Sequence, residues 1–284
     1  MNEIKLSSQS PLFHATHADR YERQSIIREY EQKFSCRLMM VFDIIGAWGI
    51  TYLEDLLYDM PKDEDLHMIL VSPGGDGESA IRMARSIQSR CHEFSVVVPD
   101  QAKSAATLLA LGAHSIIMGP TSDLGPIDPQ LQVNPNSNQL ISAKNIIAAV
   151  ENAAEEVKKV PETLPLYASL LSNVNALMLQ QAKAAMNQSK TLLKEALESQ
   201  PNRSSEQVDD LSMYLQQKLI EVPDSHSAPF GAEAAKQARL CVKELPGDSE
   251  QWQMIWRLWT KYFVLGQRIY EGNRVSHSVG SWNH

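Results

Sequence analysis

The chain has 284 residues, of which 43% are hydrophobic and 21% are charged. This apolar fraction can build a real core and excludes a disordered chain, while the length predicts one large domain with an appended helical part. The 26 basic and 34 acidic side chains give a net charge of −8, which argues against nucleic acid as a partner.

The remaining composition places the protein in the cytoplasm. Three isolated cysteines without a CxxC pair argue against a disulfide framework and indicate reduced thiols. No apolar run reaches the roughly 18 to 20 residues of a membrane helix, and the polar N-terminus has no signal region. The histidines show no ligand spacing. We therefore expect a cytoplasmic protein with no membrane partner and no metal.

The first half of the chain shows the pattern of an α/β domain. We expect about the first 19 residues to be loosely ordered and residues 20–34 to form a charged helix. Short apolar runs then predict buried strands at 37–45, 66–72, 94–98 and 114–118. Segments with helical spacing lie between or after them, at 50–57, 78–90 and 104–112. This alternation predicts a mainly parallel sheet.

The second half is predicted to be mostly helical. Residues 142–219 are rich in helix-forming side chains, and further helices are predicted at 232–240 and 252–270. The closing helix has an aromatic stripe at spacings of four, three and four: Trp252, Trp256, Trp259 and Phe263. Such a stripe predicts an amphipathic helix packed on the body of the protein or on another subunit.

A glycine-rich segment, Ser72-Pro73-Gly74-Gly75-Asp76-Gly77, lies between a predicted strand and a predicted helix. It matches neither the GxGxxG nor the GxxxxGK[ST] pattern, so it is not a nucleotide-binding loop of those kinds. Adjacent glycines at a strand end can expose backbone N–H groups beside a helix N-terminus, which is how an oxyanion hole is built. A plain turn is the alternative interpretation.

The segment QAKSAAT, residues 101–107, follows the third predicted strand and opens a helix of small residues. Its serine, Ser104, can serve as a helix N-cap. A strand-to-helix turn also exposes a hydroxyl at a helix N-terminus, where a nucleophile is stabilised. Both interpretations remain open from spacing alone.

The two segments together resemble a known family. SPGGDGESA, followed roughly thirty residues later by VVPDQAKSAATLLALGAHSIIMGP, resembles the Clp-type and signal-peptide-peptidase serine peptidases of the crotonase-like superfamily. LGPIDPQL and HSAPFGAEAAKQARL extend the resemblance, which is strongest to the serine dehydrogenase proteinases. It implies an α/β, crotonase-like (Clp peptidase-type) ββα spiral with an extended helical C-terminal region. No dinucleotide fingerprint is present, so no dehydrogenase is implied.

This resemblance also implies a domain organisation. We expect an N-terminal arm and helix at 1–35 and the Clp-like catalytic core at 36–135. Residues 136–284 are expected to form a helical region that completes the core and supplies oligomer contacts. Relatives of this fold form rings or stacked trimers, so a homo-oligomer is implied.

Carried over residue by residue, the resemblance assigns the nucleophile to Ser104 and the oxyanion hole to the amides of Gly75 and Ala105. It implies a serine peptidase that hydrolyses peptide bonds through an acyl-enzyme, without a cofactor. The implied substrate is a peptide or an unfolded protein.

The general base is left open. Clp peptidases place a histidine about 25 residues beyond the serine, but here Asp128 follows Ser104 by 24 residues. His226 lies in the segment that resembles the region of their triad carboxylate. With His226 as base and Asp128 as its orienting acid, a Ser–His–Asp constellation is rebuilt from exchanged positions. Lys144, 40 residues after Ser104, is the alternative base, as in signal-peptide-peptidase relatives.

Two other functions remain alternatives. An acyl-CoA-processing enzyme of the crotonase-like superfamily uses the same oxyanion hole without a serine nucleophile. A catalytically silent scaffold that binds peptides or partner proteins is the second alternative, and the unassigned base is what sustains it.

Overall fold

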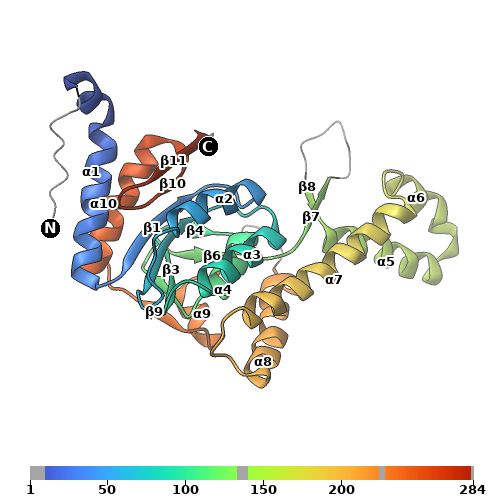
Figure 1. Ribbon diagram of the computed structural model, residues 1–284. Helices are drawn as coiled ribbons and strands as arrows, with labels where there is room; N and C mark the ends of the chain where they lie inside the picture. Colours follow the sequence, from blue (N-terminus) through green and yellow to red (C-terminus); the bar gives the residue numbers. More distant parts are fainter. Residues whose placement is uncertain (1–9, 133–139, 224–227, 283–284) are drawn as a thin grey trace.

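A seven-stranded sheet runs through the centre of the protein (Figure 1). The computed structural model describes residues 10–132, 140–223 and 228–282. The strands of this sheet are β1 (Arg37–Phe42), β2 (Leu66–Val71), β3 (Phe94–Val98), β5 (Ser115–Met118), β9 (Val242–Glu244), β10 (Gln267–Glu271) and β11 (Ser276–Ser281). Their order is β11-β10-β1-β2-β3-β5-β9. The five strands from β1 to β9 are parallel, and the β10–β11 hairpin extends the sheet antiparallel to β1.

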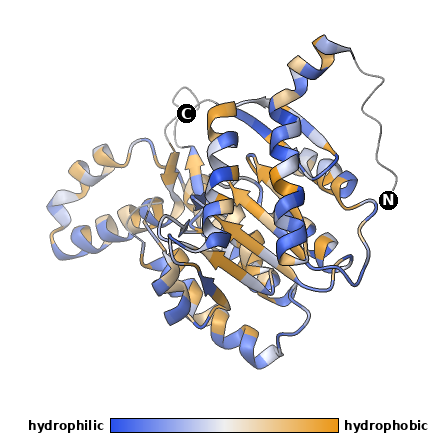
Figure 2. Ribbon diagram, turned by 90° about the vertical axis from the view of Figure 1, so that its left-hand side faces the viewer, coloured by the Kyte–Doolittle hydropathy of each residue, from blue (hydrophilic) through white to orange (hydrophobic). Residues whose placement is uncertain are grey.

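Helices cover both faces of this sheet (Figure 1). One face carries α1 (Pro11–Phe34) and α10 (Glu250–Leu265), and the other carries α2 (Ala47–Leu56), α3 (Gly77–Gln88) and α4 (Ala105–Leu111). Because successive strand residues point to opposite faces, β1 serves two cores: its even-numbered residues from Leu38 to Phe42 pack with α1 and α10, while Met39 and Val41 pack with α2 to α4. The central strands β1, β2, β3 and β5 are therefore hydrophobic along most of their length (Figure 2).

Short second pairings follow the parallel strands and produce a ββα repeat. After β1, Ile45 pairs with Gly75, and after β2, Ser72 pairs with Ala102. After β3, strand β4 (Gln101–Ala102) pairs in parallel with β6 (Asp123–Leu124). After each of β1, β2 and β3, the chain thus forms a short strand-like pairing outside the main sheet and then enters a helix. The expectation of an α/β, ββα fold is confirmed.

The helical region begins after a hairpin of β7 (Gln130–Gln132) and β8 (Leu140–Ser142). It comprises α5 (Ala143–Lys159), a 3-10 turn (Pro161–Thr163), α6 (Leu164–Leu170), α7 (Ala176–Glu198), α8 (Ser205–Gln216), a π-helical turn (Gln217–Glu221) and α9 (Ala232–Gln237). Helices α5 and α6 project from the body, and α7 leads back to it (Figure 1). Within the described ranges, no helix has the length and hydropathy that crossing a membrane requires.

Two predicted helices near the ends of the chain are present, but one boundary of each is wrong. Helix α1 begins at Pro11, well before residue 20, because Ser10 caps it: the Ser10 hydroxyl accepts a hydrogen bond from the Phe13 N–H at 3.2 Å. The closing helix ends at Leu265 because Gly266, with φ 60°, provides a left-handed C-cap. The residues after it, predicted as helix up to 270, instead form β10.

The aromatic stripe of α10 is divided between the core and the surface. Trp252 and Trp259 are each 5% exposed and pack in the core with α1 and the sheet. Trp256 and Phe263 are 41% and 53% exposed. Half of the stripe therefore packs on the chain's own body, and only its exposed half is available to another subunit. The homo-oligomer stays a prediction.

A partly buried histidine, His67, is expected to make the stability of the protein depend on pH. The His67 Nδ1 lies 2.9 Å from the Tyr30 hydroxyl, which accepts a hydrogen bond from Gln251. Burial, helped by the positive charge of Lys243, lowers the pKa of His67 to about 4. The unfolded chain, with a histidine pKa of about 6.5, therefore binds this proton first as the pH falls.

We expect the free energy of unfolding to fall as the pH drops from about 6.5 to about 4, with a His67 contribution of about 2 kcal/mol lost at pH 5. Urea unfolding at pH 7.5 and pH 5 measures this loss. The His67→Gln variant should lose most of the difference between the two pH values. An unchanged difference in that variant would assign the pH dependence to other groups.

Candidate active site

Ser104 lies at the turn between β4 and α4 with a strained backbone. Its φ of 50° and ψ of −116° are rare for a residue with a side chain. It occupies the N-cap position of α4, yet its hydroxyl makes no capping hydrogen bond, and the side chain is half-buried. The N-cap interpretation therefore does not explain this serine. Strain of this kind is concentrated at functional sites. Among the described residues, no hydrogen bond to the Ser104 hydroxyl is found.

The glycine-rich segment contacts this serine directly. Gly74 and Gly75 have φ values of 113° and 138°, which side chains rarely adopt. A Cβ on Gly74 would lie 2.7 Å from the Cβ of Ser104, and one on Gly75 would lie 2.1 Å from the carbonyl oxygen of Ile45. Both positions therefore require glycine, and the loop packs tightly between the serine and the end of β1.

The two expected oxyanion donors are available at this place. Among the hydrogen bonds of the described residues, none uses the N–H of Gly75 or of Ala105. Gly75 is exposed, and Ala105 is the first residue of α4, where backbone N–H groups lack helical partners. Both residues line the same cavity as Ser104. Their amides can therefore stabilise negative charge that develops beside the serine.

A cavity of 430 Å³ is lined by Ser104 and also by Asp128. Asp128 is 2% exposed, and the Gln130 side chain donates a hydrogen bond to its Oδ2 at 3.2 Å. Apolar side chains of Leu108, Ile127 and Leu192 line the same cavity. The structure thus brings Ser104, both amides and Asp128 to one site.

The structure describes only one of the two candidate bases, Lys144. His226 lies outside the described residues, so its place at the site stays a prediction. Lys144 is not among the residues that line the Ser104 cavity. Its Nζ donates hydrogen bonds to the carbonyl oxygens of Glu221, at 3.2 Å, and of Pro223.

Sequence reasoning missed the contribution of α7 to the cavity. Gln188, Ser189 and Leu192 of this helix line it, and Gln188 donates a hydrogen bond to the Glu78 carboxylate at 3.0 Å. A Cβ on Gly77 would lie 2.8 Å from Leu192, so α7 packs closely on the start of α3. In the sequence, only the glycine at position 77 indicated that another segment packs closely there. It did not indicate which helix this is.

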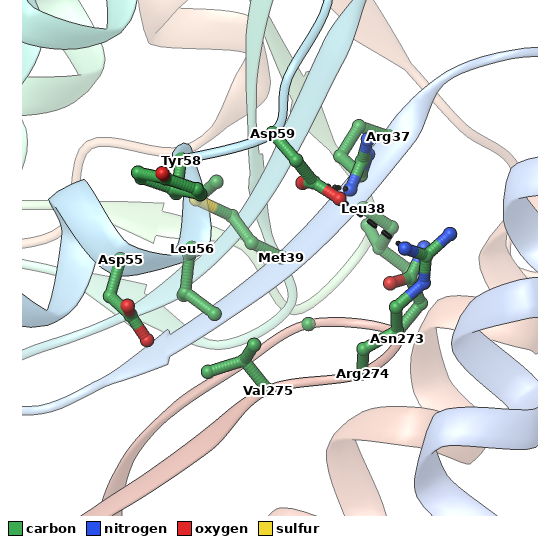
Figure 3. A pocket seen from close by; sticks show the side chains of 11 residues that line it. Arg37, Leu38, Met39, Asp55, Leu56, Tyr58, Asp59, Asn273, Arg274 and Val275 are labelled. Carbon is green, nitrogen blue, oxygen red and sulfur yellow. Dashed lines mark hydrogen bonds and ion pairs between the residues drawn. The ribbon is translucent and has the colours of Figure 1, made fainter.

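A second pocket, of 330 Å³, lies at the other end of the parallel strands, where β1 begins (Figure 3). Its polar groups neutralise one another: Arg37 and Arg274 both form ion pairs with Asp59, and Arg37 also pairs with Glu64. Its described lining residues include no serine, threonine, cysteine or lysine. Across the described residues, no group of three His, Cys, Asp or Glu side chains could hold a metal ion. Of these two pockets, the Ser104 cavity is the one with the features of catalysis.

A strained serine between a strand and a helix, beside free backbone amides, defines the class of serine hydrolases. Comparison with known proteins narrows this class. Residues 17–243 match the ClpP-like SDH-type serine proteinases, and the chain belongs to this family. It is also similar to two uncharacterized proteins of Methanocaldococcus jannaschii. One is 30% identical over 78% of this chain and 73% of that protein, and the other is 31% identical over 37% and 33%.

Solved structures with similarity to this chain include two peptidases. One is a membrane-bound stomatin-specific protease, with a TM-score of 0.45 and 16% identity over 78% of this chain and 81% of that one. The other is a peptidase from Plasmodium falciparum, with a TM-score of 0.40 and 12% identity over 74% and 95%.

Proposed function

We propose that the protein is a peptidase that hydrolyses peptide bonds through an acyl-enzyme on Ser104. The observation that carries this proposal is the strained Ser104, whose uncommitted hydroxyl shares a cavity with the free amides of Gly75 and Ala105. The Ser104 oxygen attacks the peptide carbonyl carbon while a base takes the hydroxyl proton. The two amides stabilise the oxyanion, the proton passes to the leaving amine, and water then releases the acid product.

The base in this proposal is His226, oriented by Asp128. The described chain resumes close to the site after residue 227: Phe230 pairs with Leu124 of β6, and β6 pairs with β4, which leads into Ser104. Lys144 is a weaker alternative because its amine donates hydrogen bonds to two carbonyl oxygens and does not line the Ser104 cavity.

Replacement of each candidate base distinguishes these two assignments. We expect His226→Ala to reduce peptide hydrolysis nearly as far as removal of the nucleophile, and Lys144→Ala to leave more than about one tenth of the rate. The rate of the unaltered protein should rise with an apparent pKa of about 6 to 7, as an imidazole loses its proton. A silent His226→Ala together with an inactive Lys144→Ala would reverse the assignment.

The lining of the cavity favours a peptide over an acyl-CoA substrate. Its titratable side chains are Asp76, Glu78 and Asp128, and no lysine or arginine is found among its described lining residues. Three carboxylates repel the phosphates of coenzyme A, whereas an extended peptide can place an apolar side chain against Leu108 and Leu192. A calorimetric titration should therefore show no coenzyme A binding.

Hydrolysis of an unfolded protein such as casein, and of a fluorogenic peptide library, tests the proposed function. Cleavage that disappears in the Ser104→Ala variant supports it. Peptide binding without any cleavage would instead favour the scaffold alternative. Action in the cytoplasm as a homo-oligomer is part of the proposal.

A further inference from the structure

We propose that Asp43 is a positioning residue for the oxyanion-binding loop, an inference that rests on the proposed peptidase function. Asp43 follows β1 directly and lies outside the residues that line the Ser104 cavity. Its carboxylate is completely buried, which is costly unless hydrogen bonds and charges compensate it. The groups that hydrogen-bond to this carboxylate or pair with its charge show which part of the chain Asp43 holds in place.

Asp43 fixes the turn that follows it. Its Oδ1 accepts a hydrogen bond from the Ile44 N–H at 2.8 Å, and its Oδ2 accepts one from the Trp48 indole N–H at 2.9 Å. The Arg268 guanidinium of β10 lies 3.6 Å from Oδ1 and supplies the opposite charge. The carboxylate therefore holds both ends of the segment 44–48 and connects it to the sheet.

The same segment holds the oxyanion loop. The Ile45 N–H donates to the Gly74 carbonyl oxygen at 2.8 Å, and the Asp76 N–H donates to the Ile45 carbonyl oxygen at 2.9 Å. These two hydrogen bonds flank Gly75 on both sides and together make up its parallel pairing with Ile45. The direction of the Gly75 N–H is therefore set by the position of Ile45, one residue beyond the hydrogen bond from Ile44 to Asp43.

Positioning from outside is needed because Gly74 and Gly75 have no side chains to restrict their own backbone. Glycine has access to more of φ/ψ space than any other residue, so without external contacts the loop samples several orientations. An amide stabilises an oxyanion only when it points at the place where the charge develops. Loss of the Asp43 contacts should therefore weaken stabilisation of the transition state more than binding of the peptide.

The test compares Asp43→Asn with a matched control, Asp65→Asn. Asp65 also accepts a hydrogen bond from a backbone N–H, that of Glu93, and lies 2.9 Å from a ring nitrogen of His92. It directly precedes β2, however, and so lies at the opposite end of the parallel strands from Ser104. We expect Asp43→Asn to reduce kcat by about 10- to 100-fold with KM changed less than about threefold. Asp65→Asn should change neither by more than about twofold.

A peptide boronate, which forms a tetrahedral adduct on the serine, separates positioning from general structural support. Its affinity should fall in Asp43→Asn by about the same factor as kcat. The affinity of an uncleaved peptide should be equal in Ser104→Ala proteins with and without Asp43→Asn. A kcat within about twofold of the unaltered protein, or equal losses of boronate and peptide affinity, would overturn the proposal.

Trp48→Phe provides a second test if Asp43→Asn fails to fold. It removes one hydrogen bond to the carboxylate and keeps an aromatic ring at a position that is 46% exposed. We expect a smaller loss, about three- to tenfold in kcat, again at constant KM. An unchanged kcat would overturn the role of this turn. An unaltered protein that cleaves no peptide would overturn the proposed function and the role of Asp43 with it.

Discussion

Replacement of Ser104 by alanine is expected to abolish peptide hydrolysis, with kcat reduced on the order of 10⁴-fold or more. The physical reason is that the acyl intermediate of the proposed reaction forms on the Ser104 hydroxyl, which shares the cavity with the amides of Gly75 and Ala105. Stability should be preserved because the Ser104 side chain makes no capping hydrogen bond to α4. Rates with a fluorogenic peptide and thermal unfolding of the variant measure the two effects. Activity within about tenfold of the unaltered protein would remove Ser104 as nucleophile.

Ser204, which has a structural role and lies outside the cavity lining, provides the control for Ser104→Ala. Ser204 caps α8 in a capping box, in which its hydroxyl accepts a hydrogen bond from the Gln207 N–H and the Gln207 side chain accepts one from the Ser204 N–H. Ser204→Ala should therefore lower the free energy of unfolding by about 1 kcal/mol and leave peptide hydrolysis unchanged. The two variants together separate a catalytic serine from a structural one.

Replacement of Gly75 by alanine is expected to have the second-largest effect. The new Cβ would lie 2.1 Å from the Ile45 carbonyl oxygen at a φ of 138°, so the loop must move. We expect kcat to fall by about 10²- to 10³-fold, the loss that follows removal of one oxyanion donor. Steady-state kinetics on the folded variant measure this loss.

Gly266→Ala is the control for backbone strain without a clash. Gly266 has a φ of 60° with no heavy atom within 4 Å of an added Cβ, and it ends α10 far from Ser104 in the sequence. It should cost about 1 kcal/mol of stability and leave kcat unchanged. If Gly75→Ala lowered only stability, the oxyanion role of this loop would be contradicted.

Much of the fold follows from local sequence signals. The buried parallel strands are continuous apolar runs between turns, and the predicted strand 94–98 coincides with β3. The β10–β11 hairpin was missed because its signal is not local. β10 follows an amphipathic helix after a single glycine, and it is a strand because it pairs with β1, more than 200 residues earlier.

Only those residues of the candidate site that lie in a recognisable local sequence pattern could be predicted. Ser104 and Gly75 each lie at a strand-to-helix junction with small neighbours, and such junctions can be read from the sequence. Gln188 and Leu192 of α7 look like ordinary helix residues, and only the tertiary structure brings them to the cavity. The role of Asp43 is equally hidden, because it acts through the pairing of two separate loops. The assignment of His226 stays a prediction.

Labelling with a fluorophosphonate probe tests the central claim most directly, because this reagent reacts only with a serine activated as a nucleophile. We predict a single covalent adduct per chain, located on Ser104 by mass spectrometry of proteolytic fragments and absent from the Ser104→Ala variant. A protein that remains unlabelled while folded, or that is labelled equally in the Ser104→Ala variant, would contradict the account.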